Sequence, residues 1–431
     1  MTISRRQALI GTGAIVGASL SEWTRAWALD QPFTPEKGAA LRILRPKPFV
    51  QTESAAFAHL VRAFAAATGI PVEISEASNP QVLLKGAMAA ETGSGPDLIW
   101  SIHADAHLYP EKLVDLSDVA DYLDGKLGGW YPIAREYGIH DGAWVCLPVA
   151  LNGNFMSYRI SWLEQAGFDR FPANLEDFMR LAKQLKKINH PIGLPLGASV
   201  TDGNCWVHWL LWQFGGAVFD EANRPTIRSP ETLQALEYAR ELFPYFVNGT
   251  LTWSDDSNNE AFAIGEIGCT NNPVSIYAEM VAAGNPVAAD TNHALYPIGP
   301  LGRPTEFHIM RPMMLFKHTR FPRAAKAFLI FMMEHPQFDN FLIGSVGQLS
   351  HTLKAYDTNS VWTSDPKRTV FREAAARCRS FAYKGKLGYA AAAVLSDQIV
   401  LEMFSEAASG QLSPRDAIER AERRVLRYIE S

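Results

Sequence analysis

Short apolar runs alternate with amphipathic segments between residues 41 and 100, and this alternation limits the possible folds more than any other feature. Strands are predicted at 41–44, 70–74 and 97–100, and helices at 53–68 and from Asn79 onward. Gly69 follows the first helix as a typical C-terminal stop. The second helix is predicted to face inward with Leu83, Leu84, Ala87 and Met88. Strand, helix, strand, helix, strand in succession predicts a parallel sheet with right-handed crossovers.

The alternation continues further along the chain. Helix starts are predicted at Asn174, at Ser229 before Pro230, and at Ser413 before Pro414, because each places a capping side chain before the helix. The length of the chain is enough for two or three domains with cores of their own. Two α/β lobes sharing one chain are therefore the predicted architecture.

Residues 1–28 have the features of a removable export signal. Arg5 and Arg6 precede an uncharged, glycine-rich run that is too short to span a membrane. The sequence 26–28 is Ala-Trp-Ala, a pattern suited to signal peptidase. The twin arginines resemble the motif of the twin-arginine route, although the general secretory route stays open. We therefore expect a periplasmic protein whose signal is cleaved after about Ala28.

Charge, cysteines and motifs exclude several classes of function. Without residues 1–28 the formal net charge is −7, so no basic field attracts nucleic acid or anionic lipid. The four cysteines are widely spaced, and whether Cys146, Cys205, Cys269 or Cys378 form disulfides stays open. No nucleophile elbow, phosphate-binding loop or zinc-protease motif occurs, so no catalytic residue and no metal ligand is predicted.

Aromatic and amide side chains gather in the segments between predicted elements. Sugars present apolar faces and hydroxyl edges, so their sites combine flat aromatic rings with planar polar groups. In doubly wound sheets such segments face the ligand crevice. Core packing is the competing explanation, above all for Trp206, which begins a helix rich in tryptophan. The candidate ligand-binding residues are Glu53, Asn79, Trp100, Ser101, His103, Asn152, Asn154, Asp202, Asn204, Trp206, Trp253, Asn271 and Asn272.

Several segments, in their order along the chain, resemble the extracellular solute-binding proteins of bacterial ABC importers, the family that includes maltose-binding protein. These segments are "LVRAFAAATGIPVEI", "GSGPDLIWSIHADAHLYPEKLVDLSDV", "GAWVCLPVALNGNFMSYRISWLEQAGFDRFPANLEDFMRLAKQLKK", "AFAIGEIGCTNNP", "YPIGP", "RAAKAFLIFMMEHPQ" and "SGQLSPRDAIERAERRV". Each segment is weakly diagnostic by itself, whereas the ordered set is specific.

The resemblance implies the two-lobed periplasmic binding protein fold of type II, with a ligand cleft at the hinge. Each lobe would hold a mixed, mainly parallel sheet flanked by helices. The first lobe would comprise 29–150 and about 273–318, and the second 151–272 and about 319–431. The chain would cross the hinge at 147–152 and at 269–273.

The resemblance also implies where ligand contacts lie. Asn152, Asn271 and Asn272 would form the floor of the cleft. The family often has a Gly-Gly pair where this chain has Glu306-Phe307-His308. We therefore add Glu306 and His308 to the candidates, as polar contacts of this chain's own.

The function implied is binding without catalysis. A monomeric, cofactor-free protein would capture a carbohydrate by closing its lobes and deliver it to the permease of an ABC importer. Signal peptidase and the twin-arginine translocase would act on it during export. Alternatives with the same fold are binding of a polyol, a phosphorylated polyol, a polyamine or an opine. A more remote alternative is an exported enzyme.

Overall fold

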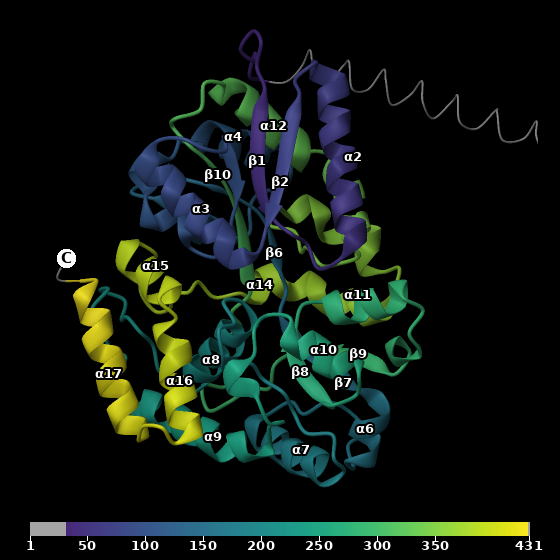
Figure 1. Ribbon diagram of the computed structural model, residues 1–431, viewed down its shortest axis with the longest axis vertical. Helices are drawn as coiled ribbons and strands as arrows, with labels where there is room; N and C mark the ends of the chain where they lie inside the picture. The colour runs from purple at the N-terminus through teal and green to yellow at the C-terminus, as the bar shows by residue number, and fades with distance from the viewer. Residues whose placement is uncertain (1–31, 430–431) are drawn as a thin grey trace, which may run out of the picture.

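The computed structural model describes residues 32–429 and has two lobes, stacked one above the other in Figure 1. Each lobe is built around its own β-sheet with helices packed against it. The predicted two-lobed α/β fold is confirmed. The predicted export signal at 1–28 lies outside the described residues.

The first lobe, at the top of Figure 1, contains a five-stranded sheet in the order β2-β1-β3-β10-β6. β1 pairs in parallel with β2 and β3, as the alternation predicts, whereas β10 is antiparallel to both β3 and β6. The strands are β1 (Leu41–Pro46), β2 (Val72–Ala77), β3 (Leu98–Trp100), β6 (Leu147–Asn152) and β10 (Ile309–Leu315). A small hairpin of β4 (Ile139–His140) and β5 (Ala143–Trp144) lies beside them.

Helices from distant parts of the sequence cover this sheet. α13 and α12 both contact α2, and α12 also contacts α4. The helices are α2 (Gln51–Thr68), α3 (Asn79–Thr92), α4 (Ser117–Lys126), α5 (Pro132–Gly138), α12 (Pro322–Met333) and α13 (Gln337–Gly344). Short 3-10 helices η1 (Asp105–Leu108) and η2 (Pro110–Lys112) follow β3. Gly69 ends α2 with a φ of 74°, the left-handed conformation that favours glycine, so the predicted stop is confirmed.

The second lobe contains a smaller sheet in which β7 lies between β8 and β9. Both pairings are antiparallel, so the expected mainly parallel sheet is wrong for these strands. Parallel contacts are limited here to single bridges such as that of Ile192 with Cys269. The strands are β7 (Phe155–Arg159), β8 (Cys269–Asn272) and β9 (Thr291–Ala294).

Helices surround the second sheet. The helix caps predicted in this lobe are confirmed. Asn174, Ser229 and Ser413 each accept a hydrogen bond from a backbone N–H three residues later. The helices are α6 (Ile160–Gln165), α7 (Leu175–Lys187), α8 (Asp202–Gln213), α9 (Pro230–Leu242), α10 (Ser257–Ala263), α11 (Ser275–Ala282), α16 (Ile399–Ser409) and α17 (Pro414–Arg427). The 3-10 helices are η3 (Phe243–Tyr245), η4 (Thr250–Thr252) and η5 (Pro286–Ala288).

The chain passes between the lobes three times. It crosses at 153–154 between β6 and β7, at 295–308 between β9 and β10, and again along 345–388. The last passage carries η6 (Lys354–Thr358), η7 (Ser360–Trp362), η8 (Pro366–Glu373) and α14 (Ala374–Arg377), and leads into α15 (Tyr389–Ser396). α14 contacts α5 and β6 of the first lobe, whereas η8 contacts β9 of the second.

Two expected boundaries are corrected by these contacts. The expected crossing at 269–273 is wrong, because β8 pairs with β7 and the chain stays in the second lobe through β9. The expected assignment of 273–318 to the first lobe therefore holds only for its β10 part. Conversely, α12 and α13 pack on α2, so the beginning of the segment 319–431 belongs to the first lobe.

Mostly small side chains form the buried face of α3. Val82, Gly86 and Ala89 face inward, and a Cβ on Gly86 would lie 2.7 Å from the Tyr109 hydroxyl. Leu84 and Met88 are 62% and 56% exposed, so the predicted inward face of this helix is wrong. The helix lies so close to its neighbours that only small side chains fit on its inner face.

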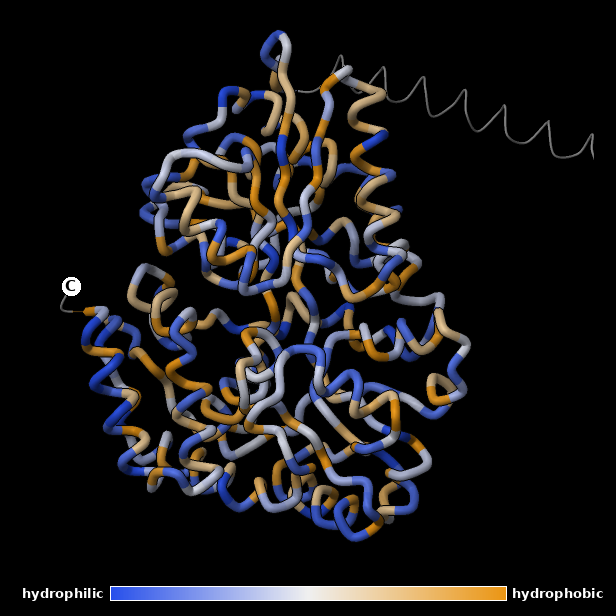
Figure 2. The backbone as a smooth tube through the Cα atoms, in the orientation of Figure 1, coloured by the Kyte–Doolittle hydropathy of each residue, from blue (hydrophilic) through white to orange (hydrophobic). Residues whose placement is uncertain are grey.

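Hydropathy otherwise agrees with position. In Figure 2 α17 is largely blue with apolar residues recurring along it, and these face α16 and α9. No helix within residues 32–429 combines the length and the apolar character that a membrane span requires.

Candidate ligand-binding cleft

One edge of the first sheet gathers polar side chains, which we call the first-lobe wall: Arg45, Glu53, Asn79, Trp100, Asn152 and Arg311. They come from the ends of β1, β3 and β6, from the beginnings of α2 and α3, and from β10. Because β10 runs antiparallel to β3 and β6, its early residues lie at the edge where those strands end.

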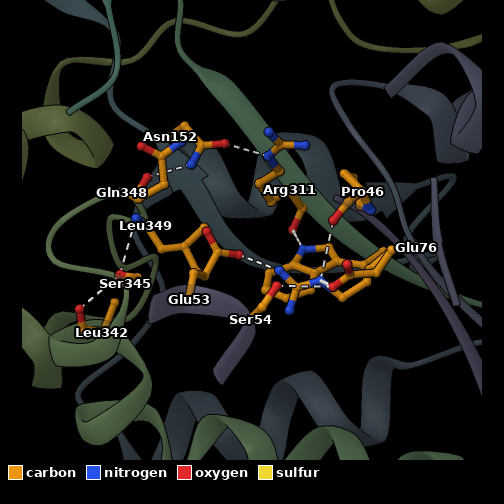
Figure 3. A network of polar contacts seen from close by, with 12 residues as sticks. Pro46, Glu53, Ser54, Glu76, Asn152, Arg311, Leu342, Ser345, Gln348 and Leu349 are labelled. Atoms are coloured by element: carbon orange, nitrogen blue, oxygen red, sulfur yellow. Dashed lines mark hydrogen bonds and ion pairs between the residues drawn. The ribbon is translucent and has the colours of Figure 1, made fainter. Parts of the chain in front are cut away.

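Arg311 is the centre of this wall. Its Nε donates a hydrogen bond to Asn152 Oδ1 (Figure 3). Its Nη1 donates to Asn79 Oδ1 at 3.1 Å. Asn152 Nδ2 donates in turn to the carbonyl oxygen of Gln348 at 2.5 Å, on the third passage of the chain. The guanidinium is therefore oriented by two amide oxygens, and one of those amides is anchored to the hinge.

Arg45 and Glu53 form a buried ion pair beside it. Arg45 Nη2 donates to Glu53 Oε1 at 2.5 Å, and both side chains are less than a tenth exposed. The Arg45 guanidinium carbon lies 4.5 Å from the centre of the Phe57 ring and 5.1 Å from that of Trp100. Burial raises the pKa of Glu53, against the opposing effect of the Arg45 charge.

A pocket opens on this wall. Arg45, Glu53, Trp100, Asn152 and Arg311 line it together with Pro46, Lys47, Pro48, Phe49, Gln348 and Leu349. Trp100 is 2% exposed and donates its indole N–H to the carbonyl oxygen of Arg311 at 3.3 Å. The pocket thus combines an aromatic ring with guanidinium, amide and carboxylate groups.

A second group of side chains, the second-lobe wall, consists of Asn154, Asp202, Asn258, Asn271 and Tyr296. Asn154 Nδ2 donates to Asp202 Oδ1 at 2.8 Å. Its Oδ1 accepts from Asn271 Nδ2 at 2.9 Å and from the Tyr296 hydroxyl at 2.5 Å. Asn258 Nδ2 donates to the other oxygen of Asp202 at 3.0 Å. Burial, followed by the nearby charge of Asp255, raises the pKa of Asp202 above its ordinary value.

The two walls meet where the chain first crosses, because only Gly153 separates Asn152 from Asn154. They also affect each other electrostatically. Burial lowers the pKa of Arg311 to about 10, and this shift is opposed first by the Glu53 carboxylate and then by the carboxylates of Asp255 and Asp202 in the second lobe. The acidic groups of the second lobe thus act on the arginine of the first-lobe wall.

His103 joins the lobes directly. Its Nε2 lies 3.0 Å from the carbonyl oxygen of Val200, and its ring stacks on Phe307 with the centres 5.1 Å apart. The backbone of His103 adopts a φ of 55°, which is uncommon outside glycine. Next to this contact a pocket lies between the lobes, lined by Ile102, Ala104 and Leu108 on one side and Ala392 and Leu395 on the other.

Glu306 and His308 belong to the hinge. Both Glu306 carboxylate oxygens accept from Arg377, at 2.7 to 3.0 Å, and His308 Nε2 lies 3.6 Å from Glu306. His308 Nδ1 accepts from the backbone N–H of Asn154 at 3.0 Å. These bonds tie the second crossing to the first and third passages. The side chains of Glu306 and His308, expected to contact the ligand, therefore bond to residues of the hinge instead.

Some candidates have side chains engaged inside one lobe. Trp206 is fully buried, donates its indole N–H to the Pro195 carbonyl at 2.6 Å and packs on Phe246, so the expected aromatic platform at this position is wrong. Ser101 Oγ donates to Asp105 at 2.5 Å, within the first lobe.

The remaining candidates lie in the second lobe. The Trp253 ring lies against Gly193, where a Cβ would be 2.6 Å away. Asn272 Nδ2 donates to Ser275 Oγ at 2.8 Å, at the beginning of α11. Asn204 Nδ2 donates to the Val200 carbonyl at 3.2 Å, beside the His103 contact.

The candidates named from the sequence do not include Arg45, Lys47, Arg311, Asn258 or Tyr296. For Arg311 a signal was present. The available signal was a charged residue inside an apolar strand, "IMRPMML". A buried strand carries such a charge only at a cost, so the position is informative by itself.

Residues 59–370 match the family model of the bacterial extracellular solute-binding proteins. The match covers well over half of the chain. The chain belongs to this family. The solute-binding protein is also 27% identical over 316 residues to the "Putative ABC transporter periplasmic-binding protein YcjN" of Escherichia coli (strain K12). That alignment covers 68% of this chain and 67% of the relative.

Solved structures have the same fold as this solute-binding protein. Maltose-bound MalE3 of T. maritima superposes with a TM-score of 0.78 at 19% identity, covering 90% of this chain and 99% of that one. A solute-binding protein of Agrobacterium radiobacter K84 in complex with ribitol gives 0.76 at 18% identity, with 91% and 99% covered. A sugar transporter protein of Arthrobacter chlorophenolicus A6 with bound laminaribiose gives 0.76 at 16% identity, with 90% and 98% covered. At these identities the likeness shows the fold alone.

Proposed function

We propose that this solute-binding protein captures a carbohydrate between its two lobes and delivers it to the permease of an ABC importer. The observation that carries the proposal is the pair of walls that adjoin at the first crossing, each rich in planar amide, guanidinium or carboxylate groups held by hydrogen bonds. Such groups are suited to hydroxyl-rich solutes because they donate and accept in fixed directions. Solved structures of the same fold hold maltose, laminaribiose and ribitol, which supports this class of solute.

Binding would couple to closure of the lobes. A solute that contacts both walls stabilises the closed arrangement by its difference in affinity for the two states. The hinge allows this motion because it consists of three passages, while each lobe keeps its own sheet. The permease would recognise the closed form. Export to the periplasm, cleavage after about Ala28 and a monomeric state complete the proposal.

A thermal-shift screen over mono- and disaccharides, sugar acids and polyols tests the class of solute. A ligand that binds only the folded protein adds about 2.7 kcal/mol to the free energy of unfolding at a hundred times its Kd. The melting temperature rises accordingly. We expect at least one carbohydrate to do so. If no compound of these classes changes the melting temperature, the proposal is wrong.

A matched pair of variants tests the site. Asn152→Ala removes the amide that orients Arg311, whereas Asn340→Ala changes an exposed asparagine on α13 of the same lobe. We expect calorimetric titration to show weaker binding for Asn152→Ala and unchanged binding for Asn340→Ala. Equal affinity for both variants would contradict the assignment of the first-lobe wall.

A further inference from the structure

The pocket on the first-lobe wall carries more positive than negative charge. Three cationic side chains line it, Arg45, Lys47 and Arg311, against a single carboxylate, Glu53. Arg45 uses that carboxylate, at 2.5 Å, and has a second one, Glu76, at 3.8 Å from its Nε. The charge of Arg45 is therefore balanced within the protein.

Arg311 has no direct ion pair. Among residues 32–429, no carboxylate lies within 4.0 Å of its guanidinium, and the hydrogen bonds of its side chain go to the neutral amide oxygens of Asn152 and Asn79. The residue is only 8% exposed, and Glu53, which pairs with Arg45, acts on it electrostatically without an ion pair. A buried charge without a directly bonded counter-ion is costly, so this position favours a role in binding. Burial lowers the pKa of Arg311 to about 10, which still leaves it charged at neutral pH.

The geometry leaves donors of this guanidinium available to a ligand. Of the five N–H groups of an arginine, the two amide oxygens take one on Nε and one on Nη1. The fork of remaining donors matches the two oxygens of a carboxylate. Lys47, exposed at the rim of the same pocket, adds a second positive charge that is free to move toward an anion.

The opposite wall limits how much negative charge a ligand can carry. Asp202 is held by Asn154 and Asn258, and Asp255 accepts from Ser199 Oγ at 2.6 Å. Both carboxylates act on Arg311 from the second lobe. A dianion would be repelled by this wall, whereas a ligand with one negative end and hydroxyl groups elsewhere satisfies both walls.

We infer that the solute is a carbohydrate bearing a single carboxylate, a sugar acid, whose negative group pairs with Arg311. This inference rests on the proposed carbohydrate function and narrows its substrate class. The carboxylate would supply the direct ion pair that Arg311 lacks among residues 32–429, and the hydroxyl groups would reach the amides of the second-lobe wall.

Calorimetric titration of the mature protein with matched pairs tests the inference. The pairs are glucuronate with glucose, gluconate with glucitol, and lactobionate with lactose, with glucose 6-phosphate as the phosphate arm. For at least one pair we expect the acid to bind about 10- to 100-fold more tightly than its neutral congener, as a hydrogen-bonded charge pair allows. Its affinity should fall with added NaCl, whereas that of a neutral sugar should not.

Variants connect this preference to one side chain. Arg311→Met should abolish the preference for the acid, Arg311→Lys should retain part of it, and Arg62→Met, an exposed arginine on α2, should leave it unchanged. Since Arg311→Met could disturb folding, its melting temperature is measured alongside, and the salt dependence of the wild-type protein provides evidence that needs no variant.

Three results would overturn the inference. Neutral congeners that bind as tightly as the acids, with no effect of salt, would leave Arg311 as a hydroxyl ligand and the proposed carbohydrate function intact. Tighter binding of glucose 6-phosphate than of any carboxylate would contradict the limit set by the second-lobe wall. Absence of binding by every compound, neutral or charged, would remove the proposed function together with the inference.

Discussion

Replacing Arg377 by methionine removes the guanidinium that neutralises the buried Glu306 carboxylate at the hinge. Glu306 is 1% exposed, and both of its oxygens accept from Arg377. The variant leaves a carboxylate in the protein interior. The His308 ring lies 3.6 Å from it and acts as a cation only when it is protonated. We therefore expect Arg377→Met to lower the free energy of unfolding substantially.

The magnitude follows from burial. Breaking a buried ion pair by removing one partner costs about 3–5 kcal/mol. The Arg377 side chain is 20% exposed, so water partly reaches the carboxylate, and the lower end of that range applies. With an unfolding entropy of about 2.1 cal/mol/K per residue over ~400 residues, ~3 kcal/mol corresponds to a fall in melting temperature of roughly 4 °C.

Differential scanning calorimetry at pH 7 measures this change, with two comparison variants. Arg372→Met breaks an exposed pair with Glu373, in which both side chains are 45% exposed, and should cost less than about 1 kcal/mol. The double variant Glu306→Gln with Arg377→Met removes both charges, so it should recover most of the lost stability.

The pH dependence gives a further check. Burial acts to raise the pKa of Glu306, but the His308 ring and the hydrogen-bonded Arg377 guanidinium lower it below its ordinary value of 4.5. The stabilisation from this group is therefore complete above about pH 4.5 and is lost as the pH falls through the lower, folded-state pKa. The difference between wild type and Arg377→Met should shrink over the same interval. The reasoning would be refuted if Arg377→Met lost no more stability at pH 7 than Arg372→Met. It would also be refuted if the double variant were less stable than Arg377→Met alone.

Four other outcomes follow from contacts in the structure. Trp206→Ala should cost about 3–5 kcal/mol in unfolding free energy, because it empties a core position; weaker ligand binding at an unchanged melting temperature would contradict this. His103→Asn tolerates the positive φ but loses the Val200 contact, so titration should show ligand affinity falling about 2- to 10-fold. Gly153→Ala should lower stability by about 1–3 kcal/mol in chemical denaturation, because its Cβ would lie 2.9 Å from that of Ala374. All four cysteines are free and buried, and burial raises the pKa of each thiol, so a thiol reagent at pH 8 should label none in the native protein and four after denaturation.

The sequence predicts the first half of the first sheet well and the second sheet poorly, for a physical reason. β1, β2 and β3 follow each other with one helix between neighbours, so local periodicity is enough to order them. β7, β8 and β9 pair across separations of more than a hundred residues, and β8 and β9 have only four residues each. Neither their partners nor their direction leaves a local pattern.

In the candidate site, too, the residues that stand out locally in the sequence were predicted and those that depend on distant partners were not. Asn152 and Asn154 were predicted because amides at the end of a strand stand out in the sequence. Trp206 was misplaced because α8 is buried on every side, so periodicity cannot tell which of its faces meets a ligand. The importance of Arg311 emerges only from the register that sets β10 against β6, and from the absence of a directly paired carboxylate among the described residues.

The place of β10 in the first sheet has a consequence for synthesis of the protein. β10 lies between β3 and β6, yet it comes more than 150 residues after β6 along the chain. During translation, β3 and β6 therefore leave the ribosome long before the strand that joins them exists. We expect nascent chains shorter than about 315 residues to expose two unpaired strand edges, which are prone to aggregation. The first lobe, although it begins the sequence, therefore cannot complete its folding until β10, α12 and α13 have been synthesised.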